Sequence, residues 1–64
     1  MKKTVMFFMT YKNNNSYGHY MSTKEYSIFT RKSKIINDFF NWNIEKQKLI
    51  NESSTTLNLK IIGL

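Results

Sequence analysis

The absence of cysteine from a chain of only 64 residues is the feature that most restricts its fold. Domains of this size bury only ~60% of their unfolded surface and often depend on disulfides or a structural metal. The sequence offers neither, because its one His and four acidic residues form no cluster with ligand spacing. We therefore expect one domain over residues 1–64, without metal or cofactor, held together by apolar packing or by a partner subunit.

Residues 3–11 predict the central strand of a sheet. Val5, Phe7 and Met9 alternate with Met6 and Phe8, so the segment is apolar on both of its faces. A strand that is apolar on both faces is typical of a sheet interior, with neighbours on each side.

The polar run at residues 13–16, with three consecutive Asn, predicts a tight turn after this strand. Asn tolerates left-handed backbone angles and hydrogen-bonds to its own backbone. We expect a hairpin whose return strand covers residues 17–22 and resumes after a kink at residues 26–29.

A helix is predicted from about Ser33, with Thr30 or Ser33 as its N-cap. Spacings of three and four residues favour one broad apolar face, made of Ile35, Ile36, Phe39, Phe40 and Ile44. We expect Ile36, Phe39 and Phe40 to pack on the sheet. Phe40 and Trp42 are both expected in the core or in a dimer interface rather than in a ligand site. Residues 51–54 should end the helix in a loop.

Alternation over residues 57–62 predicts a final strand. A right-handed crossover through the helix then gives an α+β fold, a ββαβ two-layer sandwich. Its three-stranded antiparallel sheet has order 2-1-3 and carries the helix on one face. The other face and both outer strands lack cover, so we expect a homodimer or a tight complex with a target.

The charge of the chain indicates a binding protein. Ten Lys and Arg against four Asp and Glu give a net charge of +6, which suits an acidic partner. Aromatic and basic residues together are typical of single-stranded nucleic-acid sites. The candidate partner-binding residues are Arg31, Lys32, Lys34, Tyr17, His19, Tyr20 and Tyr26.

Catalytic motifs for nucleotide, phosphate, zinc or calcium chemistry are absent from the sequence, so we expect no enzyme and assign no catalytic residue. One segment, Gly18-His19-Tyr20, resembles the motif of small ribonuclease toxins that place a catalytic His on a strand. Those toxins begin with a helix that this chain lacks. A ribonuclease using His19 is therefore kept as an alternative, beside a small basic nucleic-acid-binding module.

The first ten residues contain two lysines and an apolar run, as a secretory signal does, but the run passes into Tyr11 and Lys12 without a cleavage site. A buried strand accounts for the same residues. No stretch reaches the ~20 apolar residues of a membrane span. We expect a cytoplasmic protein that does not enter a membrane.

Taken whole, the chain resembles small proteins of phages and prophages from AT-rich Gram-positive bacteria. The resemblance lies in nine Lys, eight Asn and seven Ile, in the hairpin around Tyr17-Gly18, in the helix and in the closing strand over residues 56–62. That group includes anti-CRISPR proteins and other inhibitors of host defence. The resemblance implies an inhibitor that acts by binding in the cytoplasm of an infected host, on an acidic protein surface or on a ribonucleoprotein such as a CRISPR effector.

Overall fold

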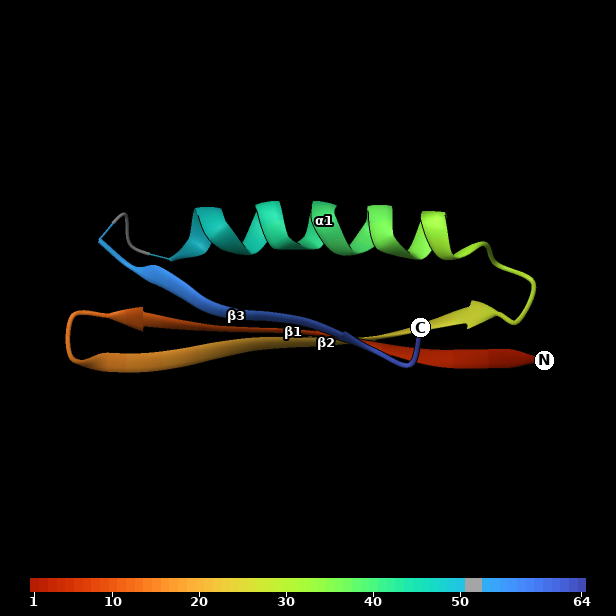
Figure 1. Cartoon of the computed structure of the whole chain (residues 1–64), viewed down its shortest axis with the longest axis horizontal. Helices are drawn as coiled ribbons and strands as arrows, with labels where there is room; N and C mark the ends of the chain where they lie inside the picture. Colours follow the sequence, from red (N-terminus) through yellow and green to blue (C-terminus); the bar gives the residue numbers. More distant parts are fainter. Residues whose placement is uncertain (51–52) are drawn as a thin grey trace.

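A computed structural model describes residues 1–50 and 53–64 and has the predicted ββαβ order (Figure 1). The elements are β1 (Lys2–Asn13), β2 (Ser16–Ser27), α1 (Lys32–Leu49) and β3 (Thr55–Ile62). The sheet is antiparallel with order β2-β1-β3, which confirms the predicted topology. Within the loop expected at residues 51–54, Asn51 and Glu52 lie outside the described residues.

The β1–β2 hairpin is long and regular. Asn13 pairs with Ser16, and Asn14 in the turn takes the left-handed backbone conformation, with φ 56°. β2 then runs without interruption to Ser27, which pairs with Lys2. The kink expected after residue 22 is wrong, because β1 extends over 12 residues and offers a pairing partner along the whole return strand.

β3 pairs with the other edge of β1 and contains an irregularity. Thr10 pairs with Asn58, whereas the next residue, Tyr11, pairs with Thr56. Leu57 is thus the extra residue of a bulge, which bends the strand and leaves this side chain 53% exposed.

The helix begins at Lys32 after an extended Arg31, and no side chain caps its first turn. The expected N-cap at Thr30 or Ser33 is therefore wrong. The first turn contains no acidic residue, while Lys46 and Lys48 in the last turn suit the helix dipole. Since its N-terminus lacks a side-chain cap, α1 depends on packing against the sheet for its stability.

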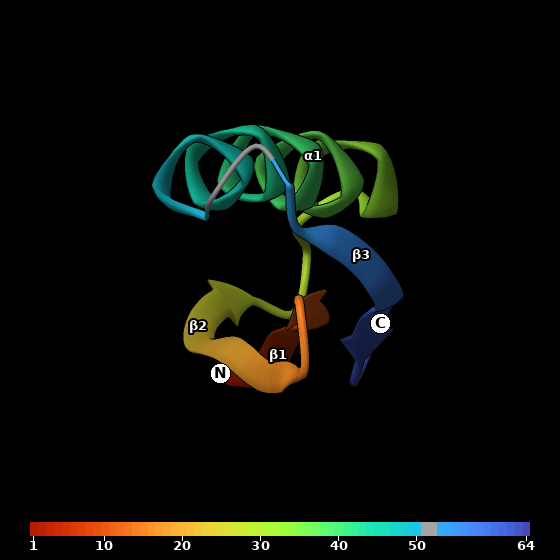
Figure 2. The same ribbon diagram turned by 90° about the vertical axis from the view of Figure 1, so that its left-hand side faces the viewer.

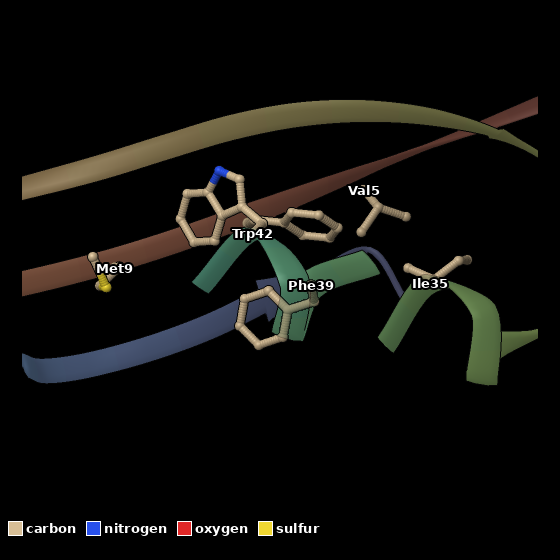
Figure 3. Packing of buried hydrophobic residues seen from close by; sticks show 6 residues of the cluster. Val5, Met9, Ile35, Phe39 and Trp42 are labelled. Carbon is tan, nitrogen blue, oxygen red and sulfur yellow. The ribbon is translucent and has the colours of Figure 1, made fainter. Parts of the chain in front are cut away.

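The core lies between α1 and one face of the sheet (Figure 3). The ring of Phe7 is 5.1 Å from that of Phe39 and 5.7 Å from that of Trp42, measured between centroids. The other buried residues of the described chain are Val5, Met9 and Ile35.

The buried helix face is rotated from the expected one. Phe40 and Ile44 are each 53% exposed, whereas Trp42 is buried. Each residue turns an α-helix by about 100°, so spacings of four and three place Ile35, Phe39 and Trp42 on one line and carry Phe40 and Ile44 away from the sheet. The expected contact of Phe40 with the sheet is therefore wrong.

The molecule is a thin two-layer rod, with Cα extents of 43 × 15 × 13 Å. α1 lies along one face of the sheet, and none of the described elements covers the opposite face (Figure 2). The sheet therefore has one structural face and one face available for contact.

Two neighbouring phenylalanines test the orientation of the helix. Phe39→Ala should lower the free energy of unfolding by ~3–5 kcal/mol, because it leaves a cavity beside Phe7. Phe40→Ala should cost about 1 kcal/mol or less, since this side chain is half exposed. Urea denaturation at low protein concentration measures both values. Equal losses in the two variants would contradict the helix orientation.

Candidate functional site

The sheet face turned away from α1 carries a continuous set of side chains, which we call the open face. Phe8 points to this side because Phe7 and Met9, its neighbours in β1, are buried under the helix. Cross-strand partners point to the same side as each other. The pairs on this face are Phe8 with Met21 and Lys60, Thr10 with His19 and Asn58, and Lys12 with Tyr17.

The open face is hollowed toward the hairpin turn. The rings of Phe8 and His19 stack there, with centroids 6.1 Å apart and planes 18° apart. Tyr17 is 70% exposed at the rim. The hollow has a volume of about 340 Å³, enough for one planar group, and is lined by Phe8, Thr10, Tyr11, Tyr17, Gly18, His19 and Leu57.

The charge around the hollow is positive. The Nζ atom of Lys12 lies 5.6 Å from the centroid of the Tyr17 ring, and Lys60 lies opposite Phe8 on β3. On the described part of the open face the single carboxylate is Glu25, which is toward the far end of the hairpin and 4.0 Å from Lys2. The hollow therefore combines aromatic rings with cations that no nearby carboxylate of the described residues neutralises.

The four aromatic residues predicted from the sequence to bind a partner lie on two different sides of the sheet. Tyr17 and His19 lie together on the open face. Tyr20 and Tyr26 lie on the other side, half-buried against the core. The last two tyrosines therefore belong to the packing between β2 and α1.

Packing also accounts for the glycine beside His19. A Cβ atom on Gly18 would collide with the ring of Tyr11, its cross-strand partner. That ring covers Gly18 and stacks on Tyr20, with centroids 5.6 Å apart, while the Nζ atom of Lys46 lies 5.4 Å from the Tyr20 ring. The small residue at position 18 thus has a structural reason that is independent of any ribonuclease motif.

Arg31, Lys32 and Lys34 lie at the N-terminal end of α1, at the opposite end of the molecule from the hairpin turn (Figure 1). Lys34 Nζ is 3.0 Å from both carboxylate oxygens of Asp38, one helical turn further on. The predicted basic cluster therefore lies far from Tyr17 and His19, and one of its charges is already paired.

Tyr26 completes a small network with this ion pair, since its hydroxyl donates a hydrogen bond to Asp38 Oδ2 at 2.9 Å. Burial, helped by this hydrogen bond and by the negative charge of Asp38, raises the pKa of Tyr26 to about 12. Hydrogen bonds from Lys34 and Tyr26 in turn lower the pKa of Asp38. The network ties β2 to the first half of α1.

Sequence reasoning missed Phe8, Lys12 and Lys60 as members of a site. Phe8 could have been found, because the alternation in residues 3–11 already places it on the face opposite Phe7. Lys12 could also have been placed, since a turn at residues 13–16 puts it opposite Tyr17. The position of Lys60 could not be predicted from the sequence, because it depends on the register of β3, which the bulge at Leu57 shifts.

No protein-family model, no curated protein and no solved structure matches this chain. The part of the chain that the structure describes contains no helix with the length and apolar character needed to cross a membrane. Those same residues bring no three His, Asp or Glu side chains together as metal ligands. The assignment of a function therefore rests on the geometry of the open face.

The Tyr26 network predicts a specific dependence of stability on alkaline pH. The pKa of Tyr26 rises from 10.0 to about 12 on folding. Its contribution to stability is therefore complete below pH 10 and is lost as the pH rises through about 12. Tyr26→Phe should remove this part of the loss. Urea denaturation of both proteins at several pH values between 9 and ~12 measures it, and parallel curves would contradict the role of this hydroxyl.

Proposed function

We propose that this chain is a non-enzymatic binding protein that holds single-stranded nucleic acid on its open face. One observation carries the proposal: the stacked pair of Phe8 and His19 lies beside exposed Tyr17 in an uncovered hollow with Lys12 and Lys60 around it. Aromatic platforms beside cations are the combination by which proteins bind unpaired bases and their phosphates.

The geometry favours single strands over duplexes. A base can stack on an aromatic ring only when its own face is exposed, as it is in an unpaired strand. The hollow has a volume of about 340 Å³, enough for one planar group. The exposed ring of Tyr17 would then stack on a base, while Lys12 and Lys60 would neutralise neighbouring phosphates.

The inhibitor function implied by the phage resemblance remains a prediction that is compatible with this proposal. If the bound strand is the RNA of a host ribonucleoprotein, such as a CRISPR effector, occupation of that RNA by the open face would block the complex. An acidic protein surface is the other partner class predicted from the charge. It would compete for the same lysines but would not need the stacked rings.

The environment of His19 supports binding rather than ribonuclease chemistry. Catalysis by His as a general base normally needs a second group that orients or completes the proton transfer. The ring of Phe8 stacks on His19, with centroids 6.1 Å apart, and this ring cannot exchange a proton. His19 is accordingly proposed as part of the aromatic platform.

The direct test is binding of a fluorescently labelled single-stranded RNA, followed by anisotropy. Tyr17→Ala should raise Kd roughly 5- to 150-fold, because a base–aromatic stack contributes about 1–3 kcal/mol. Phe29→Ala is the matched control, since Phe29 is an 87% exposed aromatic residue on the β2–α1 connection. The control should bind as the parent does. Equal affinities of all three proteins would contradict the proposal.

Two double variants, each lacking two positive charges, test whether nucleic acid binds at the hollow or at the helix N-terminus. Lys12→Gln with Lys60→Gln should reduce the slope of log Kd against log salt by about 1.4, since each phosphate contact on a single strand contributes about 0.7. Arg31→Gln with Lys32→Gln removes the same two charges at the other end of the molecule and should change the slope less. A larger effect of the second pair would place the site at the helix N-terminus. Binding to an acidic protein with no binding to RNA would favour the protein partner instead.

A further inference from the structure

We propose that a second copy of this chain docks against the side of the molecule formed by β3 and α1, giving a two-fold dimer with a continuous six-stranded sheet. Two unpartnered features coincide on this side. One is the outer edge of β3, and the other is an apolar stripe on α1, made of exposed Phe40 and Ile44 and of half-buried Ile36 (the α1 stripe).

The position of the α1 stripe follows from a hydrogen bond. Gln47 Nε2 donates to Thr56 Oγ1 of β3 at 2.6 Å, so this side of the helix faces β3. Phe40 precedes Gln47 by seven residues, or nearly two full turns, and therefore lies on the same side. Ile36 and Ile44 are four residues before and after Phe40, which extends the stripe along the helix. Phe40 and Ile44 are each 53% exposed.

β3 provides an open strand edge beside the α1 stripe. It is an outer strand in the order β2-β1-β3, so the backbone groups on its outer side pair with no strand of the described residues. Such an edge pairs readily with another strand unless charges or irregularities protect it. The bulge at Leu57 protects the start of β3, whereas the part from Asn58 to Ile62 is regular and contains one charged residue, Lys60. Leu57 and Ile62, at 53% and 49% exposure, add apolar surface at the two ends of the strand.

The distribution of charge distinguishes this side from the β2 side. β3 contains one charged residue, Lys60, and the α1 stripe contains none. On the β2 side, the strand carries Lys24 and Glu25 and the helix carries the Lys34–Asp38 pair. Charged residues are depleted from the centres of protein interfaces and are used to protect exposed strand edges. Lys60 shares the open face with Phe8, so the outer edge of β3 and the α1 stripe offer little charge to nucleic acid or to an acidic protein in a chain with a net charge of +6.

A second copy fits this side because the surface is complementary to itself. Antiparallel pairing of β3 with its own copy about a two-fold axis places both helices on the same face of the joined sheet. An axis at Leu59 puts Lys60 opposite Asn58 of the partner and so avoids opposing two lysines. The two α1 stripes then face each other above the joined strands, and the uncharged contact limits repulsion between two positively charged chains.

Sedimentation equilibrium of the nuclease-treated protein tests this dimer. The parent should sediment as a species of twice 7.7 kDa, or 15.4 kDa, at micromolar concentration. Phe40→Gln with Ile44→Gln should raise the dimer dissociation constant at least ~10-fold, since two exposed apolar anchors are lost. Ile28→Gln with Phe29→Gln replaces one Ile and one Phe that are also exposed, away from this side, and should leave the dimer intact.

Disulfide trapping tests the register without disturbing the core. The chain has no cysteine, and Asn58 and Lys60 are both exposed. Asn58→Cys with Lys60→Cys should give a covalent dimer on mild oxidation, because paired strands hold opposite Cα atoms within disulfide range. The same change at Thr23 and Glu25, on the outer strand β2, should not give a covalent dimer.

Three results would each overturn the proposal. They are a parent that stays monomeric, a dimer lost equally in the Ile28/Phe29 control, and cross-linking at β2 in place of β3. None of these readouts uses nucleic acid, so they leave the proposed binding function to its own test.

Discussion

The contact of Phe7 with Phe39 and Trp42 is the interaction on which the rest of the structure depends. Through it a single uncapped helix is held against the central strand, with ring centroids 5.1 and 5.7 Å from Phe7. The described residues form one helix, which covers one face of the sheet. The strict alternation of β1 then places Phe8 on the opposite side, where none of the described elements covers it.

This division gives the two faces of the sheet different roles. On the covered face, Tyr20 and Tyr26 pack against the core, and the Tyr26 hydroxyl connects β2 to the helix through Asp38. On the open face, Tyr17 and His19 are free to meet a partner, and Phe8 gives them a rigid base on the central strand. Aromatic residues of β2 therefore stabilise the fold on one side of the strand and take part in the proposed binding on the other.

The sequence was sufficient to predict the element order, the hairpin turn at three consecutive Asn and the order of the strands, because alternation and turn chemistry are local signals. It could not select the buried helix face, since α1 has more large apolar residues than one face accommodates. Phe40, expected against the sheet, is exposed for that reason, while Trp42 lies in the core, one of the two places expected for it. The binding site was only partly predictable. Arg31, Lys32 and Lys34 are conspicuous because they are close in sequence, whereas Lys12 and Lys60 are brought together only by the pairing of β1 with both of its neighbours and by the bulge at Leu57.

An amide chemical-shift map of the isotopically labelled protein, titrated with a short single-stranded RNA, tests most directly the claim that the uncovered sheet face is the working surface. The largest shifts should fall on residues around the hollow, namely Phe8, Thr10, Tyr17, His19 and Lys60. The amides of Ile35, Phe39 and Trp42 in the core should stay nearly unchanged. Shifts concentrated at residues 31–34 with an unperturbed hollow would contradict that claim.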